Sequence, residues 1–239
     1  MNASSEVSAL QQVRVPSIIM VGADKGGVGK TMTCRALLDY LDHRQRSCRA
    51  FDTQYPAGVL HRFRSDADVV DIANIQDQMI VFDGIDPEHV TVLDVCGGLL
   101  SPTISALDRA GLLDDVRSGA VRMTIAHVLG PTRESLDEIG EAARRLGSSA
   151  RHLLVKNYVN ETTYKIASDP AYAKYFEVMA PGTITIPKLP ALAAEDVNAK
   201  SVSFAAYAGD VANSRILRGN VHHWLTAVWA EFDRVGIAA

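Results

Sequence analysis

The amino-acid sequence predicts an α/β fold of three layers, in which a doubly wound, mostly parallel β-sheet lies between two layers of helices. Short apolar runs that are typical of buried strands alternate with helical patterns from residue 17 onward. A glycine-rich turn separates the first strand from the first helix, and polar residues follow several later strands. Because ligands of such sheets bind at the carboxyl ends of the strands, we expect a functional site at that edge.

The same alternation divides the chain into a tail and one domain. Residues 1–16 are polar and serine-rich, so we expect a flexible N-terminal tail. No long linker interrupts residues 17–239, which predicts a single domain. The expected strands are residues 17–21, 48–51, 69–73, 90–95, 121–128, 152–155 and 183–186. The expected helices are residues 31–43, 76–82, 104–116, 133–146, 164–179, 191–208 and 210–235.

Local signals mark the ends of individual elements. Pro56 and Gly58 indicate that residues 53–66 form a loop after the second strand. Gly147 is expected to end the fourth helix, and Gly219 is a candidate break in the last one. Pro187 directly follows the last strand and is expected to stop it.

Composition limits the broad class of the protein. Of 239 residues, 47% are hydrophobic, which is enough for a sizeable core, and the net charge of −4 gives no global attraction to nucleic acid or to anionic membranes. Cys34, Cys48 and Cys96 form no paired spacing, which is typical of a reducing compartment. Residues 1–16 lack the apolar stretch of a signal peptide, and no apolar run is long enough to span a bilayer. These observations predict a cytoplasmic protein that does not bind a membrane.

The glycine-rich turn is the strongest functional signal in the chain. It reads Val21-Gly22-Ala23-Asp24-Lys25-Gly26-Gly27-Val28-Gly29-Lys30-Thr31. Glycines let backbone N–H groups close around phosphate oxygens, and the N-terminus of the next helix adds a partial positive charge. Lys30 can reach the β- and γ-phosphates, and the Thr31 hydroxyl can ligate Mg²⁺. The alternative is a flexible turn without a ligand. The residues expected to bind the nucleotide here are Gly26, Gly27, Val28, Gly29, Lys30, Thr31 and Met32.

The run at residues 25–31 resembles the deviant Walker A loop of the ParA/MinD family of P-loop ATPases. The usual loop has glycine five residues before Gly29, where this chain has Asp24, and it lacks the additional Lys25. The resemblance implies a P-loop NTPase fold that binds ATP or ADP with Mg²⁺. It also implies an ATP-dependent homodimer, in which Lys25 of one subunit reaches the phosphates of its partner.

Polar residues at the ends of two further strands complete the expected catalytic and metal sites. Asp94 closes a buried strand and can bind a water of the Mg²⁺ shell, although a turn-capping role stays open. Relatives end the second strand in Asp-x-Asp, whereas this chain has Asp52-Thr53-Gln54. Glutamine can orient a water but cannot take its proton, which predicts a Mg²⁺-dependent ATPase with slow intrinsic hydrolysis. The expected catalytic residues are Lys25, Lys30, Asp52 and Gln54, and the expected metal ligands are Thr31 and Asp94.

Two later residues are candidates for contact with the base. Asn157 resembles the family's strand-end asparagine, whose amide offers both a donor and an acceptor and suits the N6/N7 edge of adenine. The chain lacks an Asn-Lys-x-Asp pattern at this place, which argues against guanine. Pro187 follows the last strand, where relatives place backbone against the base. Either residue could instead be a simple turn former.

The C-terminal region has two candidate surfaces. Its last helix carries apolar residues at helical spacing but also Glu231 and Asp233 on its polar face, so we expect it to pack on the domain and not on a membrane. Arg215 and Arg218 lie where relatives bind DNA without sequence specificity, a contact that a dimer would double. The alternative for these two arginines is an ordinary solvated face.

The resemblance implies a nucleotide-switched dimer that acts in plasmid or DNA partition, conjugative transfer or intracellular positioning, with a protein activator or cargo adaptor as partner. One alternative is an ATP-dependent ligase of the dethiobiotin-synthetase or cobyrinate-amidating type. Such ligases lack the paired lysines in this form, so Lys25 argues against them. A second alternative is a nucleotide-binding scaffold with negligible turnover, which Gln54 would permit.

Overall fold

The computed structural model describes residues 14–23, 26–130, 134–159, 162–170 and 173–238. Most of the predicted tail and the predicted catalytic residue Lys25 therefore lie outside the described residues. The strands are β1 (Ser17–Gly22), β2 (Cys48–Asp52), β3 (Ala67–Val69), β4 (Val90–Asp94), β5 (Arg122–Val128), β6 (Arg151–Asn157) and β7 (Gly182–Ile186). The helices are α1 (Lys30–His43), α2 (Ile75–Phe82), α3 (Leu100–Arg109), α4 (Leu112–Ser118), α5 (Glu134–Leu146), α6 (Ala173–Met179), α7 (Ala191–Lys200), α8 (Phe204–Gly209) and α9 (Arg215–Val235).

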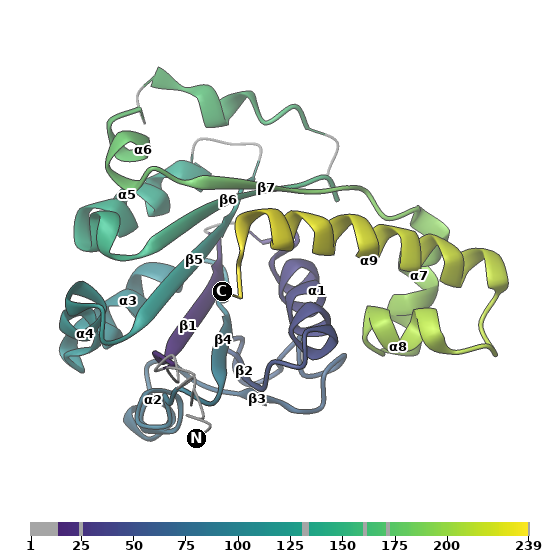
Figure 1. The fold of residues 1–239 in the computed structure, drawn as a ribbon, viewed down its shortest axis with the longest axis horizontal. Helices are drawn as coiled ribbons and strands as arrows, with labels where there is room; N and C mark the ends of the chain where they lie inside the picture. The colour runs from purple at the N-terminus through teal and green to yellow at the C-terminus, as the bar shows by residue number, and fades with distance from the viewer. Residues whose placement is uncertain (1–13, 24–25, 131–133, 160–161, 171–172, 239) are drawn as a thin grey trace, which may run out of the picture.

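The seven strands form one sheet in the order β3-β2-β4-β1-β5-β6-β7, and every neighbouring pair is parallel. Because β1, β4 and β2 are neighbours and run parallel, their carboxyl ends lie at the same edge of the sheet, whose strands Figure 1 labels. This arrangement confirms the predicted three-layer α/β fold. It also brings the loops that follow β1, β2 and β4 to the place where such sheets bind ligands.

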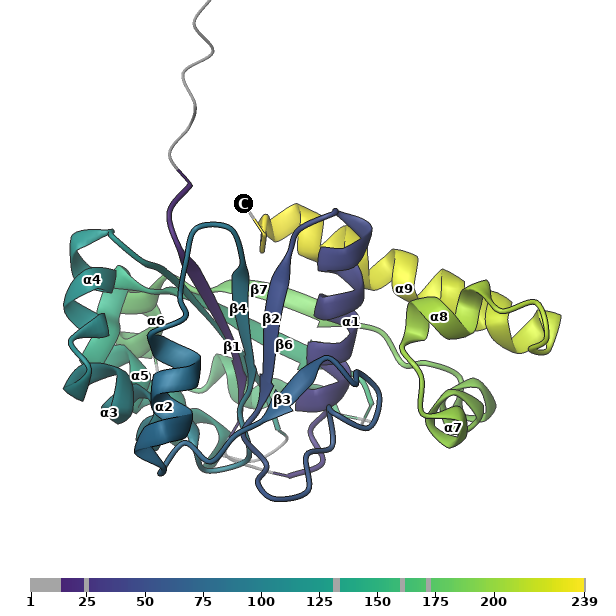
Figure 2. The ribbon, with the colours of Figure 1, turned by 90° about the horizontal axis from the view of Figure 1, so that it is seen from below.

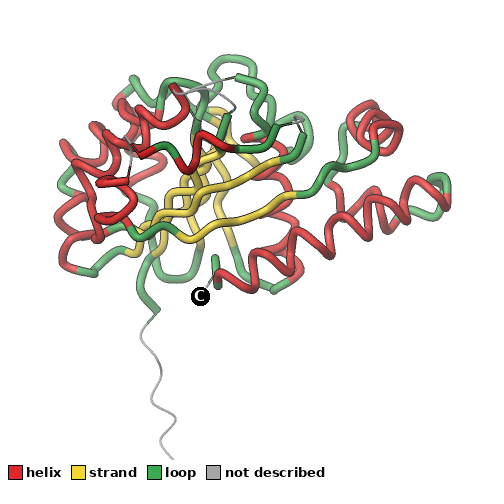
Figure 3. The backbone as a smooth tube through the Cα atoms, turned by 90° about the horizontal axis from the view of Figure 1, so that it is seen from above, coloured by secondary structure: helices red, strands yellow, loops and turns green. Residues whose placement is uncertain are grey.

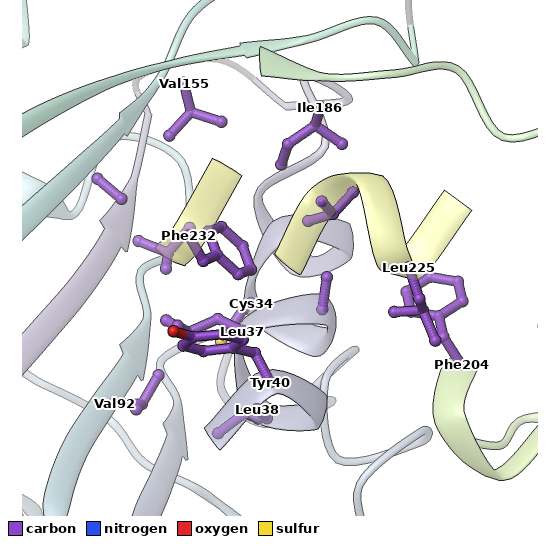
Figure 4. Packing of buried hydrophobic residues seen from close by; sticks show 14 of the residues in the cluster. Cys34, Leu37, Leu38, Tyr40, Val92, Val155, Ile186, Phe204, Leu225 and Phe232 are labelled. Atoms are coloured by element: carbon purple, nitrogen blue, oxygen red, sulfur yellow. The ribbon is translucent and has the colours of Figure 1, made fainter. Parts of the chain in front are cut away.

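Helices cover both faces of the sheet, as Figures 1 and 2 show. One core lies between the sheet and helices α1 and α9, and the second lies between the opposite face and helices α2 to α5. Figure 4 shows the first core, where Cys34, Leu37 and Leu38 of α1 lie among Phe232 of α9 and side chains of the sheet. Every apolar position along β1 is buried, because a parallel strand in the middle of such a sheet packs on both faces.

Helices α7 and α8 and the first half of α9 extend past the sheet, and we call residues 191–220 the C-terminal arm (Figure 3). The second half of α9 packs on α1 and β7 and attaches the arm to the core. Val221, Trp224, Leu225, Val228 and Phe232 of this helix are buried, so its apolar positions pack on the rest of the chain as expected.

The structure divides two of the predicted helices. The expected helix at 104–116 is interrupted at Gly111, which has φ +78° and leaves α3 and α4 as separate helices. The expected helix at 191–208 breaks at Ser201, which has φ +54°, and the Ser203 hydroxyl caps α8 by accepting from Ala206 N at 3.1 Å.

Three other boundaries also differ. In the described part of residues 164–179, the helical segments are the short 3₁₀ turn Lys165–Ser168 and α6. Helix α9 begins at Arg215 and continues through Gly219 without a break. Strand β3 ends at Val69, where a strand over residues 69–73 was expected. These differences leave the order of elements unchanged.

Candidate functional site

The glycine-rich loop turns tightly between β1 and α1. Gly27 has φ +76° and Gly29 has φ +95°, a backbone region that favours glycine. A Cβ atom on Gly29 would lie 2.3 Å from the Nδ2 atom of Asn157, whereas Cβ atoms on Gly26 and Gly27 would meet no heavy atom within 4 Å. The loop is therefore packed tightly where it meets β6 and open on the side of Gly26 and Gly27.

A cavity of about 600 Å³ adjoins the open side of the loop, and we call it the loop cavity. Its walls come from the start of α1 and from the loops that follow β2 and β4. The lining residues are Gly26, Gly27, Gly29, Lys30, Thr31, Met32, Gln54, Val59, Cys96 and Gly97. The fold thus brings the predicted Lys30, Thr31 and Gln54 to one cavity, although they come from different segments of the chain.

Two buried carboxylates lie beneath this cavity at the ends of neighbouring strands. Asp52 and Asp94 are paired in register between β2 and β4 and are 1% and 3% exposed. Burial raises the pKa of Asp94 to about 7; the charge of Asp52 adds to this effect, while a hydrogen bond from Thr31 and the charge of Lys30 oppose it. A cation beside Asp94 would stabilise its ionised form, so this carboxylate and the Thr31 hydroxyl fit a bound divalent ion.

The described residues contain no cluster of three or more His, Cys, Asp or Glu side chains that could hold a metal unaided. Mg²⁺ is commonly held by one or two protein oxygens together with phosphate oxygens and water. Thr31 and Asp94 therefore suit a metal that arrives with a phosphate ligand.

The carboxylate of Asp52 shapes the loop after β2. It accepts a hydrogen bond from Gln54 N at 2.9 Å and another from Leu60 N at 2.6 Å. Gly58 lies so close that an added Cβ would be 2.8 Å from the Asp52 Oδ2 atom. Asp52 does not line the loop cavity, whereas Gln54, which it positions, is exposed there.

Thr53 is a residue of this site that the sequence did not single out. It is 2% exposed, and its backbone N–H and hydroxyl donate to the carbonyl of Asp94 at 3.1 and 3.3 Å. Its hydroxyl accepts from Cys96 N at 2.8 Å. Thr53 therefore ties the loops that carry Gln54 and Cys96 to each other, and its position between Asp52 and Gln54 is the one signal that could have indicated this.

Asn157 holds the glycine-rich loop in place. Its side chain is fully buried, and Nδ2 donates to the carbonyl of Gly29 at 3.2 Å and to the Thr33 hydroxyl at 3.4 Å. Its Oδ1 atom accepts from Val159 N at 3.0 Å. The sequence did not indicate this anchoring role. Recognition of a base by Asn157 stays a prediction.

A second cavity of about 360 Å³ lies on the arm side of α1, and we call it the arm cavity. Its lining residues are Met32, Arg35, Val159, Lys188, Leu189, Ala191, Ala194, Glu195, Asn198 and Phe204. Met32 also lines the loop cavity, so this residue lies between the two spaces. The predicted Pro187 directly precedes the lining segment, and its carbonyl accepts from the indole N–H of Trp224 at 2.7 Å.

Arg35 is a buried cation in the wall of the arm cavity that sequence reasoning missed. Its guanidinium carbon lies 3.6 Å from the ring centroid of Phe63 and 4.0 Å from that of Phe204. It donates to Asn198 Oδ1 at 2.9 Å and to the carbonyl of Val202 at 3.1 Å, while its Nε atom has no hydrogen-bond partner. Burial lowers its pKa to about 9, which the charge of Asp39 opposes.

Arg215 and Arg218 lie at the start of α9 on the arm and line neither cavity. Arg215 is exposed and Arg218 is half-buried. Contact of these residues with DNA stays a prediction. Among the described residues, helices fall short of the length and apolar character that crossing a membrane requires.

No protein-family model matches the chain, and no curated protein matches its sequence. Solved structures with a similar arrangement include the cell division protein MinD of Aquifex aeolicus, at 12% identity and a TM-score of 0.46, over 88% of this chain and 97% of that one. The MinC:MinD complex of Aquifex aeolicus matches at 13% identity and a TM-score of 0.45, over 88% and 96%. A nucleotide-binding protein of Archaeoglobus fulgidus in complex with ADP matches at 12% identity and a TM-score of 0.46, over 90% of each chain.

Proposed function

We propose that the protein is a Mg²⁺-dependent ATP-binding switch that forms a homodimer when ATP is bound. The observation that supports this most strongly is the loop cavity, in which an open glycine turn, Lys30 and Thr31 lie above the buried carboxylate of Asp94. Backbone N–H groups, a lysine and the N-terminus of α1 together provide the positive environment that phosphates need. The phosphates lie in this cavity in our proposal, and the base enters the arm cavity past Met32.

Each side chain has a specific role in this proposal. Lys30 would neutralise the terminal phosphates, and Thr31 and Asp94 would hold Mg²⁺, whose charge would stabilise the phosphate groups. Asp52 orders the loop that carries Gln54, and the Gln54 amide orients the attacking water. Because Gln54 cannot accept the proton of that water, hydrolysis is slow without a partner. Asn157 and Pro187 line neither cavity, so contact of either residue with adenine would require the base to approach the end of β6 or the segment after β7.

The surface around the cavities supports a dimer interface. Tyr55, Val59 and Val159 are 61%, 38% and 40% exposed and lie at or beside the cavity walls. Exposed apolar side chains next to a charged ligand suit a face that another subunit covers. Lys25 of one subunit reaches the phosphates of the other in this dimer. Such a switch would serve DNA partition, conjugative transfer or positioning, through a protein activator or cargo adaptor and a DNA contact at Arg215 and Arg218.

Cys96 provides a direct test of nucleotide binding. It lines the loop cavity and is half-buried, whereas Cys34 is fully buried. We expect ATP with Mg²⁺ to slow alkylation of Cys96, as measured by peptide mass spectrometry, and Cys48 outside the cavity to serve as the internal control. Lys30→Ala should abolish the protection. If ATP leaves the alkylation of Cys96 unchanged, the protein does not bind ATP at this loop.

The dimer is tested by sizing the protein with ADP and with a non-hydrolysable ATP analogue. We expect a dimer with the ATP analogue only, which Lys25→Ala abolishes. Lys165→Ala, which removes an exposed lysine elsewhere, should leave dimerisation unchanged. A monomer, or a dimer that responds neither to nucleotide nor to the loss of Lys25, would overturn the switch. A nucleotide-binding scaffold without turnover is the second candidate, because the described residues that line the cavity include Gln54 but no carboxylate, and a measurement of phosphate release would distinguish it.

A further inference from the structure

We propose that the C-terminal arm responds to the terminal phosphate of the bound nucleotide, and that Phe63 and Arg35 position it. The signal would pass from Gln54 through the loop after β2 to the junction of α7 and α8. This inference rests on the proposed function, since it requires ATP and ADP to occupy the loop cavity. It assigns a regulatory output to a part of the chain that lies outside the sheet.

The first step is the set of hydrogen bonds that connects the loop cavity to Phe63. Gln54 and Val59 line the loop cavity. The Asp52 carboxylate binds Gln54 N and Leu60 N, and the carbonyl of the fully buried Leu60 accepts from Phe63 N at 2.9 Å. Because Gln54 N and Leu60 N share the Asp52 carboxylate, a contact between a phosphate and Gln54 that shifts this carboxylate would also shift Leu60 and, through its carbonyl, Phe63.

The second step is the contact between this loop and the arm. The Arg35 guanidinium lies over the ring of Phe63 and also over the ring of Phe204 at the start of α8. Both aromatic rings lie within the distance at which a cation–π attraction operates. Arg62 adds a hydrogen bond from its Nε atom to the Ser201 hydroxyl at 2.8 Å. The loop after β2 therefore meets the arm directly.

The third step is the place at which the arm is held. Arg35 donates to Asn198 Oδ1 and to the carbonyl of Val202, on either side of Ser201, where the chain turns from α7 into α8. Figure 2 shows that α7 and α8 lie beyond the sheet, next to α9. Because these helices extend past the sheet, the contacts at this junction and their packing on α9 together hold their position. Loss or displacement of the contact between Phe63 and Arg35 would therefore change how firmly α7 and α8 are held.

Amide hydrogen exchange of the full-length protein tests this inference. Exchange is measured by mass spectrometry with saturating Mg²⁺·ADP and with a saturating Mg²⁺-bound non-hydrolysable ATP analogue. Because both ligands carry the same base, a difference between them in residues 191–210 reports the terminal phosphate, acting directly or through the dimer that it induces, and not occupation of the arm cavity. We expect slower exchange of this segment with the ATP analogue than with ADP.

Substitutions at Phe63 then test the route. Phe63→Ala should abolish the difference in the arm while peptides over residues 26–32 stay protected by both nucleotides; Phe63→Leu, which keeps apolar bulk but loses the aromatic face, should reduce it. Phe176→Ala provides the matched control, since Phe176 is also half-buried but packs in a separate cluster on α6. The control should keep the full difference between the two nucleotides.

Each contrary outcome has a distinct meaning. Equal exchange of the arm with both nucleotides in the unmodified protein, together with protection of residues 26–32, would overturn the coupling and leave the proposed function standing. A difference that survives both substitutions of Phe63 would overturn the route through Phe63 and Arg35. Failure of either nucleotide to protect residues 26–32 would overturn the proposed function and this inference with it.

Discussion

Replacement of Asn157 by alanine separates the two roles that this residue could have. The substitution removes the hydrogen bonds from Nδ2 to the Gly29 carbonyl and from Val159 N to Oδ1. We expect the variant to weaken binding of ATP and of inorganic tripolyphosphate by the same factor. The reason is that the amide is fully buried and its bonds hold the loop, so its loss should affect every ligand that uses the loop phosphate site.

The expected magnitude follows from the bonds that are lost. The substitution also removes the bond from Nδ2 to the Thr33 hydroxyl. A buried hydrogen bond contributes about 1 kcal/mol net, so the three bonds together suggest a fall of about 3 kcal/mol in the free energy of unfolding. The Gly29 carbonyl keeps its bonds from Thr33 N and the Thr33 hydroxyl, both at 2.9 Å, so it is not left without a donor. Only the bond to Gly29 acts on the loop itself, and about 1 kcal/mol corresponds to a roughly five-fold loss of affinity.

Isothermal titration with ATP and with tripolyphosphate, together with urea unfolding, measures both quantities. Asn213→Ala is the matched control, because Asn213 is 6% exposed and donates to the Tyr207 carbonyl at 2.9 Å in the arm. The control should lose stability but bind tripolyphosphate normally. If Asn157→Ala weakens ATP and leaves tripolyphosphate unaffected, the anchoring argument fails and base recognition by Asn157 is supported.

Three further predictions concern hydrolysis, the metal and pH. Turnover of ATP without a partner should stay below about 1 s⁻¹, because Gln54 cannot act as a base, and faster phosphate release in a purified sample would contradict this. Asp94→Asn should remove the dependence of ATP affinity on Mg²⁺, since it neutralises the buried carboxylate, and titrations with Mg²⁺ and with EDTA measure the change. Burial lowers the pKa of His127 to about 3 and of His152 to about 4, from 6.5, so both stay neutral in the fold while the unfolded chain takes up protons. The contribution of these two histidines to the free energy of unfolding is fully present above the pKa of the unfolded chain. It falls by about 4 kcal/mol between about pH 7.5 and about pH 5. His127→Gln should halve this pH-dependent loss in the free energy of unfolding, which urea unfolding at several pH values measures. A variant of the exposed His223 should retain the full loss.

The order of elements could be predicted because each signal is local. Apolar runs and glycine-rich turns report burial and chain reversal within a few residues, and the parallel sheet follows from their alternation. The two helix breaks escaped prediction for a similar reason. Apolar spacing continues across Gly111 and Ser201, and only the observed positive φ angles show that the chain turns there.

The candidate site could be predicted only where a residue acts next to its own strand. Lys30, Thr31 and Asp94 belong to this group. The position of Asp52 depends on a return of the chain, since the loop must come back eight residues later to present Leu60 N. The role of Asn157 in holding the loop depends on a contact with Gly29, which is 128 residues away in the sequence, and no local pattern predicts this contact. Long-range contacts of this kind decide which polar residues become buried.

Arg35 shows how such a contact changes the interpretation of a residue. On the sequence of α1 alone it is an ordinary helical arginine, but Phe63 and Phe204 from two distant segments bury it to 3% exposure. It follows Thr31 by four residues, so the two side chains lie on the same side of α1 with about 6 Å of rise between them. One helical turn thus separates the residue that would hold Mg²⁺ from the residue that holds the arm. Since α1 is packed on both the sheet and α9, a ligand at Thr31 and the arm at Arg35 act on the same rigid element. The fold therefore places the residue that holds the arm one helical turn from the proposed metal site, although the two residues bind partners from different segments of the chain.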